Sequence, residues 1–207
     1  MEFADVIKRR KMVRAFTGEA LPPGTADRLL RAANRAPSAG FSQGYSFLVL
    51  EGPEQAAPLW EIFYEDAPAA GDQEAYERAQ IDALSRAPLV IVTLACKDVY
   101  LDRYARPDKG WTDRDESHWP VPYWDIDTGF LALLMLLAAV NEGLGALFFG
   151  IPPELIPQFR RLYGVPDAYM PIGAVAIGHP DPASDKGGSS KVIKRRSLDE
   201  LVHQGRW

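Results

Sequence analysis

The stretch DTGFLALLMLLAAVNEGLGALFFG, residues 127–150, decides the fold expected for this chain. Its first part, Asp127–Glu142, is apolar almost throughout and predicts a long helix that stops before a glycine. Its second part predicts a short strand over Ala146–Phe149. The uninterrupted apolar run Gly129–Val140 is shorter than the roughly 20 residues that a helix needs to cross a bilayer. We therefore expect a buried core helix followed by a strand.

The rest of the chain contains further strands and helices on both sides of this stretch. Apolar runs predict strands over Tyr45–Leu50, Leu89–Cys96 and Met170–Gly178. Helices are expected at the N-terminus, after an N-cap at Thr25, over residues 53–86 with a break at Pro68 and Gly71, and after Pro152-Pro153. There is no internal repeat and no clear linker. Residues 1–207 are therefore expected to form a single domain, an α+β or α/β sandwich.

Between Lys97 and Tyr123 the periodic pattern disappears, and a long loop is expected. A loop of this length inside a compact domain is usually functional, such as an active-site lid, or else disordered. Its aromatic side chains favour a lid, although an oligomer contact would have the same composition. They are Tyr100, Tyr104, Trp111, Trp119 and Tyr123.

Positive charge is concentrated at two places in an acidic chain. The formal net charge is −5, which argues against a general nucleic-acid or anionic-membrane surface. One basic cluster lies near each end of the chain, and neither contains an acidic residue. Either cluster alone would most simply be a solvated face, but together they predict a local anion site. Their members are Lys8, Arg9, Arg10, Lys11 and Arg14, and Lys191, Lys194, Arg195 and Arg196.

Several other kinds of site find no support in the sequence. Gly143-Leu144-Gly145 follows a helix rather than a strand and lacks the third glycine of a dinucleotide-binding loop. The sequence contains no phosphate loop, no serine-hydrolase elbow and no histidine pair with metal-ligand spacing. An anion site without reactive side chains of its own suits an enzyme whose cofactor performs the chemistry.

The cysteine content and the N-terminus bear on the cellular compartment. The single cysteine, Cys96, ends an apolar strand, so we expect a buried, unreactive thiol and no internal disulfide. The N-terminal residues lack the basic start and the apolar stretch of a secretory signal. A cytoplasmic protein is therefore expected.

Four blocks of the sequence resemble the FMN-dependent nitroreductase family. Each block is weak alone, but their order and spacing along essentially the whole chain match the family. The blocks are Arg10–Phe16, Ala36–Gln43, Asp127–Gly150, and Ile177–Pro180 with Lys194–Val202. The resemblance implies an α+β fold, namely a three-layer α/β/α sandwich with a mostly antiparallel central sheet and an extended C-terminal arm. It also implies a homodimer with FMN at the subunit interface.

The resemblance assigns the two basic clusters to the FMN phosphate, which guanidinium groups can hold bidentately. Arg195 is set aside, because alternate residues of an extended tail point in opposite directions. Met12 stands where the family has a serine, so one hydroxyl donor is missing. Arg14 is implied beside the N1/O2 edge of the flavin, where a cation stabilises the reduced cofactor. The implied phosphate contacts are Arg10, Lys11, Lys194 and Arg196.

The second and third blocks are implied to lie along the flavin ring. Ser38 would otherwise be a simple turn residue after proline. Backbone N–H groups around Phe149, Gly150 and Ile151 would face the flavin O4 and N5, although core packing explains Phe149 equally well. The implied ring and ribityl contacts of the turn are Pro37, Ser38, Ala39, Ser42 and Gln43.

The resemblance leaves the substrate open. Phe41 stands where the family commonly has an asparagine, so the wall of the pocket is more aromatic and less polar there. The aromatic insert at about residues 97–123 lies where the family varies most. The expected substrate-side residues are Phe41, Tyr104, Trp111 and Tyr123.

The sequence thus predicts an FMN-dependent oxidoreductase that needs neither a catalytic side chain nor a metal. NADH or NADPH would reduce the flavin, and a small electron-poor acceptor would then be reduced at the same place in a ping-pong reaction. Nitroaromatics, quinones and enones are such acceptors. The alternatives are dehydrogenation, reductive dehalogenation or flavin fragmentation on the same fold, a deazaflavin in place of FMN, or a flavin-binding protein without turnover.

Overall fold

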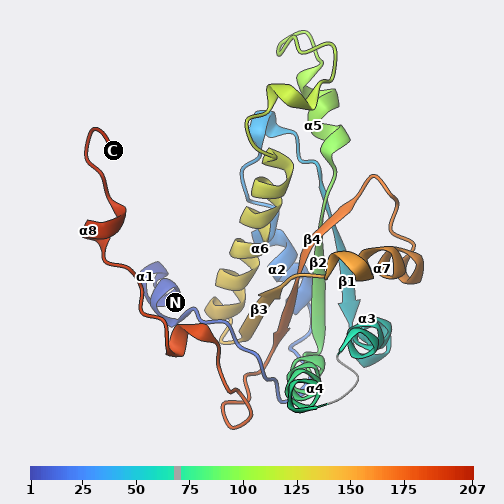
Figure 1. The fold of residues 1–207 in the computed structure, drawn as a ribbon, viewed down its shortest axis with the longest axis vertical. Helices are drawn as coiled ribbons and strands as arrows, with labels where there is room; N and C mark the ends of the chain where they lie inside the picture. Colours follow the sequence, from blue (N-terminus) through green and yellow to red (C-terminus); the bar gives the residue numbers. More distant parts are fainter. Residues whose placement is uncertain (68–70) are drawn as a thin grey trace.

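The centre of the molecule is an antiparallel sheet with the strand order β1-β2-β4-β3. The structure, a computed structural model, describes residues 1–67 and 71–207, so the expected break at Pro68 lies outside the described residues. Figure 1 shows the sheet edge-on between two sets of helices. The strands are β1 (Tyr45–Glu51), β2 (Leu89–Ala95), β3 (Gly145–Phe149) and β4 (Met170–Gly178).

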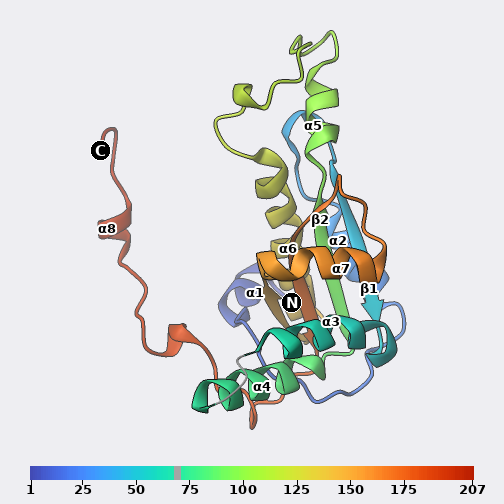
Figure 2. The ribbon, with the colours of Figure 1, turned by 45° about the vertical axis from the view of Figure 1, so that its right-hand side comes forward.

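Helices cover both faces of this sheet. In Figures 1 and 2, α2 and α6 lie on one side, and α3, α4 and α7 lie on the other. The helices are α1 (Phe3–Arg9), α2 (Thr25–Ala33), α3 (Pro53–Asp66), α4 (Asp72–Ser85), α5 (Lys97–Tyr104), α6 (Tyr123–Asn141), α7 (Ile156–Tyr163) and α8 (Leu198–Leu201).

Alternation along the strands divides the interior into two cores. Because successive side chains of a strand point to opposite faces, Leu89 and Ile91 of β2 pack against α2 and α6. Val90 and Val92 of the same strand pack against α3 and α7. All four side chains are fully buried. The three-layer α/β/α sandwich and the antiparallel sheet that the sequence predicted are therefore confirmed.

Helix α6 is longer than predicted, because it begins at Tyr123, directly after Pro122, rather than at Asp127. By length and composition it is apolar enough to cross a membrane, a test that the core helix of a soluble protein also passes. One side of the helix packs against the sheet and α2 through Leu131, Met135 and Ala139. Its opposite side leaves apolar side chains exposed.

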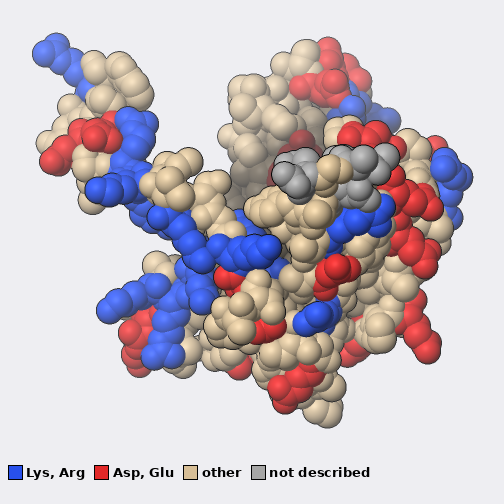
Figure 3. All heavy atoms as spheres, turned by 60° about the horizontal axis from the view of Figure 1, so that its bottom comes forward, with Lys and Arg blue, Asp and Glu red and all other residues tan. Residues whose placement is uncertain are grey.

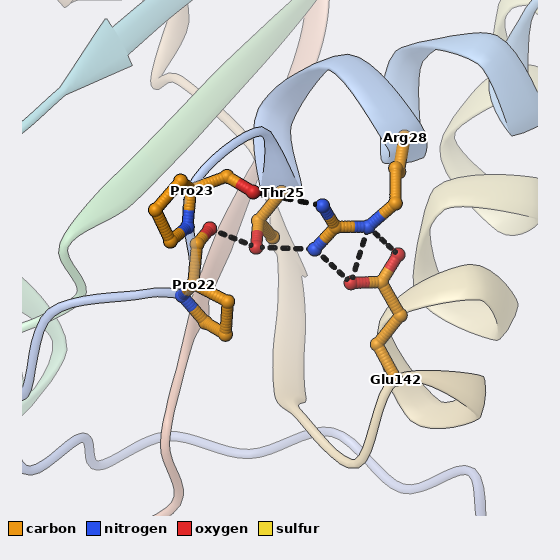
Figure 4. A network of polar contacts seen from close by, with 5 residues as sticks. All are labelled: Pro22, Pro23, Thr25, Arg28 and Glu142. Atoms are coloured by element: carbon orange, nitrogen blue, oxygen red, sulfur yellow. Dashed lines mark hydrogen bonds and ion pairs between the residues drawn. The ribbon is translucent and has the colours of Figure 1, made fainter.

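The start of α2 differs from the prediction, because Gly24, with φ 74°, is the N-cap. Figure 4 shows that Thr25 instead donates its hydroxyl hydrogen to the carbonyl of Pro22 at 2.7 Å. Arg28 donates to the Thr25 hydroxyl oxygen and to both carboxylate oxygens of Glu142. Since Glu142 follows the last residue of α6, this network ties the first turn of α2 to the end of α6.

Two segments outside the sandwich complete the fold. The prediction of a continuous loop over 97–123 is wrong: α5 occupies its first part, and a 3-10 turn spans Glu116–His118. The C-terminal segment, residues 192–207, runs away from the body as an extended arm that carries α8 (Figures 1 and 2). Val192 and Trp207 on this arm are 86% and 98% exposed.

Candidate functional site

The basic residues of both chain ends meet at a cavity of about 730 Å³, here called the basic cavity. Its volume lies within the roughly 300–1,000 Å³ that is usual for cofactor and ligand pockets. Figure 3 shows Lys and Arg side chains running along the arm and onto the adjoining face of the body. The cavity is lined by the cations Arg10, Lys11, Arg14, Lys191 and Arg195, and by Met12, Leu133, Leu136, Pro182, Asp185 and residues 187–190.

The segment after α1 points its cations into this cavity because it is extended. Met12 forms a parallel bridge with Ala146 at the edge of the sheet, and the Val13 N–H donates to the Ala146 carbonyl at 3.0 Å. Val13 turns inward and is only 2% exposed. Its neighbours Met12 and Arg14 therefore point the other way, to the cavity.

Arg14 is held by the segment that precedes the arm. The backbone N–H of Arg14 donates to Oδ2 of Asp185 at 3.3 Å, and its guanidinium donates to the Met12 carbonyl at 3.3 Å. The guanidinium lies so close to Gly188 that a Cβ at that position would meet it at 2.7 Å. The absence of a side chain at Gly188 thus permits the chain to pass over Arg14.

Arg14 also lines a second cavity, of about 420 Å³, here called the aromatic cavity, whose wall includes Trp60, Phe63, Phe148 and Phe149 as well as the acidic residues Asp66 and Glu77. Phe149 stacks on Trp60 with ring centroids 5.6 Å apart and meets Phe63 edge-on at 5.9 Å. Phe149 and Gly150 both line this aromatic cavity. Ile151, in contrast, is buried in the core and lines neither cavity. A cation beside an aromatic wall suits a flat ring with an electron-rich edge.

The arm residues are arranged differently from the prediction. Arg195, which was set aside, lines the basic cavity, whereas Lys194 and Arg196 do not. Arg196 instead pairs with the Glu200 carboxylate at 3.4 Å and donates to the Glu200 carbonyl at 2.8 Å. A 3-10 turn over Ser189–Lys191 bends the chain just before the arm. The direction of each arm side chain therefore cannot be predicted from the alternation of a straight, extended tail.

The turn expected along the flavin ring, residues 37–43, lies at the other end of α6. The N–H of Ala39 donates to Oδ2 of Asp127 near the start of that helix, at 2.8 Å. The basic cavity contacts α6 at Leu133 and Leu136. At about 1.5 Å per residue, Asp127 lies about 9 Å from Leu133 and about 13 Å from Leu136 along the helix axis. Within one chain, Pro37, Ser38, Ala39, Ser42 and Gln43 are therefore not brought to the basic cavity.

The four expected substrate-side residues lie at this same end. Tyr104 packs against Trp111 and Trp119, with ring centroids 4.8 and 4.4 Å apart. Tyr123 joins the group through Trp119 at 5.5 Å. Phe41 is exposed and lines a polar cavity of about 570 Å³ together with Ser42, Gln43 and residues of α5.

The residues that hold this turn were not predicted from the sequence. Asp127 is a carboxylate that is only 3% exposed, and its Oδ2 accepts from the Tyr100 hydroxyl as well as from Ala39. Burial, and then the hydrogen bond to Asp127, raise the pKa of Tyr100. Arg103 donates to the Gly40 carbonyl at 2.9 Å. The sequence offers no clear signal for this role, because Asp127 stands at the start of the apolar stretch, where an acidic residue is ordinary.

Comparison with known proteins agrees with this architecture. A model of the nitroreductase family matches residues 7–179. A provisionally named NADH dehydrogenase/NAD(P)H nitroreductase of Archaeoglobus fulgidus is 24% identical over 100% of this chain and 99% of its own length. An FMN reductase (NADPH) of Bacillus subtilis is 24% identical over 88% of this chain and 67% of its own length.

A solved structure has the same fold. A nitroreductase family protein from Clostridium difficile superposes with a TM-score of 0.69 at 22% identity, covering 100% of both chains. The family match, the helix-covered antiparallel sheet and the full-length structural superposition all agree. The chain belongs to the nitroreductase family.

Proposed function

We propose that this protein is an FMN-dependent oxidoreductase that uses NADH or NADPH to reduce small electron-poor acceptors. The observation that carries the proposal is the position of Arg14, which lines both the basic cavity and the aromatic cavity. A cofactor with a phosphate and a flat ring would place its phosphate among the cations of the basic cavity and its ring against the aromatic side chains of the second cavity. The name of the FMN reductase (NADPH) relative supports the same cofactor and reductant.

The residues present fit FMN. Arg10 and Lys11 would hold the doubly charged phosphate, and the arm would add cations from Lys194 and Arg196, or from Arg195 as it stands. Arg14 would lie beside the N1/O2 edge of the ring and stabilise the negative charge of the reduced flavin. Bound FMN would accept hydride from the nicotinamide and pass it to the acceptor, so no side chain needs to act as a nucleophile.

We further propose that the working form is a homodimer, because in one chain the 37–43 turn lies beside the start of α6, whereas the basic cavity touches α6 at Leu133 and Leu136 and is not lined by the turn. A second chain could bring its 37–43 turn to the basic cavity of the first. Apolar side chains suited to such an interface are exposed along α6 and α1 and on the arm. They are Tyr123, Ile126, Phe130 and Leu133, Phe3 and Ile7, and Val192, Ile193, Leu198, Leu201 and Val202.

The aromatic cluster around Trp119 would face an acceptor in this arrangement, since it adjoins the turn and Phe41. Aromatic walls favour planar acceptors such as nitroaromatics, quinones and enones. The buried free thiol of Cys96 is compatible with a reducing cytoplasm, where we place the protein.

A visible spectrum of the purified protein tests the proposal. We expect the flavin absorption bands, and we expect anaerobic addition of NADH or NADPH to bleach them. Addition of a quinone or a nitroaromatic should then restore the oxidised spectrum. A colourless protein that does not bind added FMN would falsify the proposal, and a yellow protein that neither nicotinamide reduces would be a flavin-binding protein without turnover.

A further inference from the structure

The 38–43 turn has an unusual backbone. Gly40, Phe41 and Gln43 have φ of 59°, 52° and 55°, in the left-handed region that residues with a side chain rarely adopt. Among the described residues, Arg114 is the only other non-glycine residue with positive φ. Such strain persists only where surrounding structure enforces it, and it concentrates at functional sites.

The bonds inside the turn are local and lie near the surface: the backbone N–H groups of Phe41 and Ser42 donate to the carbonyls of Ser38 and Ala39 at 2.9 and 3.1 Å. The Ser42 hydroxyl donates to the Ala39 carbonyl at 2.6 Å, and the Gln43 N–H donates to the Ser38 hydroxyl at 3.1 Å. These short-range bonds compete with water. The remaining support must come from outside the turn.

Buried support comes from Asp127 and Tyr100. One oxygen, Oδ2 of Asp127, accepts both the Ala39 N–H and the Tyr100 hydroxyl, each at 2.8 Å. The Tyr100 ring also lies where a side chain at Gly44 would be, since a Cβ there would meet it at 2.6 Å. The turn is thus fixed at its start by the carboxylate and just beyond its end by the ring.

Two further residues of α5 hold the middle of the turn. Arg103 donates to the Gly40 carbonyl at 2.9 Å, while Asp108 holds the other side of its guanidinium with two bonds. The Tyr104 ring packs so closely on Gly40 that a Cβ there would meet it at 2.7 Å. Tyr100, Arg103 and Tyr104 share one face of α5, because residues three and four apart are neighbours on a helix.

We propose that this face of α5, together with Asp127, is a clamp that positions the 38–43 turn against the flavin ring. The proposal rests on the proposed function, in which the turn contacts FMN. It gives the first part of the insert a positioning role in cofactor binding rather than only a place in the substrate pocket. Since Tyr104 also packs against Trp111 and Trp119, the clamp connects the flavin side of the turn to the aromatic cluster.

Flavin affinities of variants test the clamp, because the ring and the phosphate can be probed separately. Fluorescence titration gives the Kd of FMN and of riboflavin, which has the ring but no phosphate. We expect Tyr100→Phe to raise both Kd values by the same factor, roughly 3- to 10-fold, as one hydrogen bond is lost. Arg103→Met should also raise both, whereas Arg10→Ala should raise the Kd of FMN alone.

Tyr163→Phe is the matched control, since it removes a tyrosine hydroxyl that donates to the Gln55 carbonyl far from the turn. It should leave both Kd values unchanged. If the wild-type protein binds flavin but Tyr100→Phe and Arg103→Met bind both flavins as wild type does, the clamp is wrong and the proposed function stands. If the wild-type protein binds neither flavin, the proposed function fails and the clamp fails with it.

Discussion

The hydroxyl of Tyr100 donates to Oδ2 of Asp127 at 2.8 Å in the interior of the molecule, where Tyr100 is fully buried and Asp127 is 3% exposed. Among the described residues, no cation pairs with this carboxylate, so hydroxyl and amide donors stabilise its charge. Directional donors fix a carboxylate more precisely than a mobile ion pair does. This relationship leads to two of the predictions below.

Removal of the Asp127 carboxylate should be strongly destabilising. Asp127→Ala leaves the Tyr100 hydroxyl and the Ala39 N–H without a partner, and we expect the free energy of unfolding to fall by about 2–4 kcal/mol. Urea unfolding followed by circular dichroism measures the change. Asp82→Ala is the control, because Asp82 accepts a tyrosine hydroxyl from Tyr64 at the surface. Its effect should stay below about 1 kcal/mol, and equal losses in the two variants would contradict the interpretation.

The protein should lose stability in alkali partly through Tyr100. Burial and the bond to Asp127 raise the pKa of this hydroxyl, so the folded state keeps a proton that the unfolded chain releases near pH 10. The contribution is complete below about pH 10 and falls as the pH rises toward the raised value. Tyr100→Phe should therefore lose less stability than wild type between about pH 9 and pH 11.5. Urea midpoints across this range test the prediction, which parallel curves for the two proteins would refute.

Within the N-terminal basic cluster, Arg10 should contribute to FMN binding and Arg9 should not. We expect Arg10→Ala to weaken FMN retention by roughly 10- to 100-fold, since a charged hydrogen bond to phosphate is lost. Arg9→Ala should have little effect, because Arg9 does not line the basic cavity. Equilibrium dialysis at low and high salt measures both. Equal effects would mean that the cluster acts only as generic charge.

The same measurement distinguishes the arm residues. Among the residues that the structure describes, Arg196 bonds only to the exposed Glu200, and an exposed pair of this kind is weak. We expect the arm to settle against a second chain and Arg196 to exchange this partner for phosphate, so Arg196→Ala should impair FMN binding more than Arg195→Ala. The reverse order would show that Arg195 keeps the place it has beside the basic cavity.

The exposed face of α6 should be required for assembly. Phe130 is 43% exposed there, and Leu162 on α7 is 47% exposed on another surface. A charge in an apolar interface is costly, so Phe130→Asp should shift sedimentation from dimer to monomer and reduce FMN binding. Leu162→Asp, with a similar exposed fraction, should do neither. A dimer that persists in Phe130→Asp would place the interface elsewhere.

The sequence predicted the sheet better than it predicted the helices. Strand β4 was expected over its exact span, because residues 172–178 are all β-branched or small and Pro180 follows shortly after them. Helix α5 was missed, because Val99, Tyr100 and Leu101 are adjacent and give no helical period. The helix packs against the 38–43 turn, a tertiary contact that no local pattern encodes.

The basic residues of the site could be predicted from the sequence, but the residues that hold the 38–43 turn could not. Arg10, Lys11 and Arg14 stand out because like charges cluster on an acidic chain. Asp127 does not stand out, because one carboxylate at the start of an apolar helix looks like an ordinary helix-dipole partner. Its role follows only from Tyr100 and Ala39, which are distant in sequence and meet it in the folded chain.

The clamp divides the 97–123 insert into an anchored part and a replaceable part. Three side chains of α5 (Tyr100, Arg103 and Tyr104) contact the turn or the residue that follows it, so substitutions at these positions would disturb the position of the turn against the cofactor. Residues 105–118 act on the turn only through α5: Asp108 bonds to Arg103, Trp111 packs on Tyr104, Arg114 pairs with Asp98 and Asp102, and Glu116 pairs with Lys97, among the described residues. A loop library grafted after Tyr104, with Asp108, Trp111, Arg114 and Glu116 kept, would therefore vary the acceptor side while leaving the support of the turn intact.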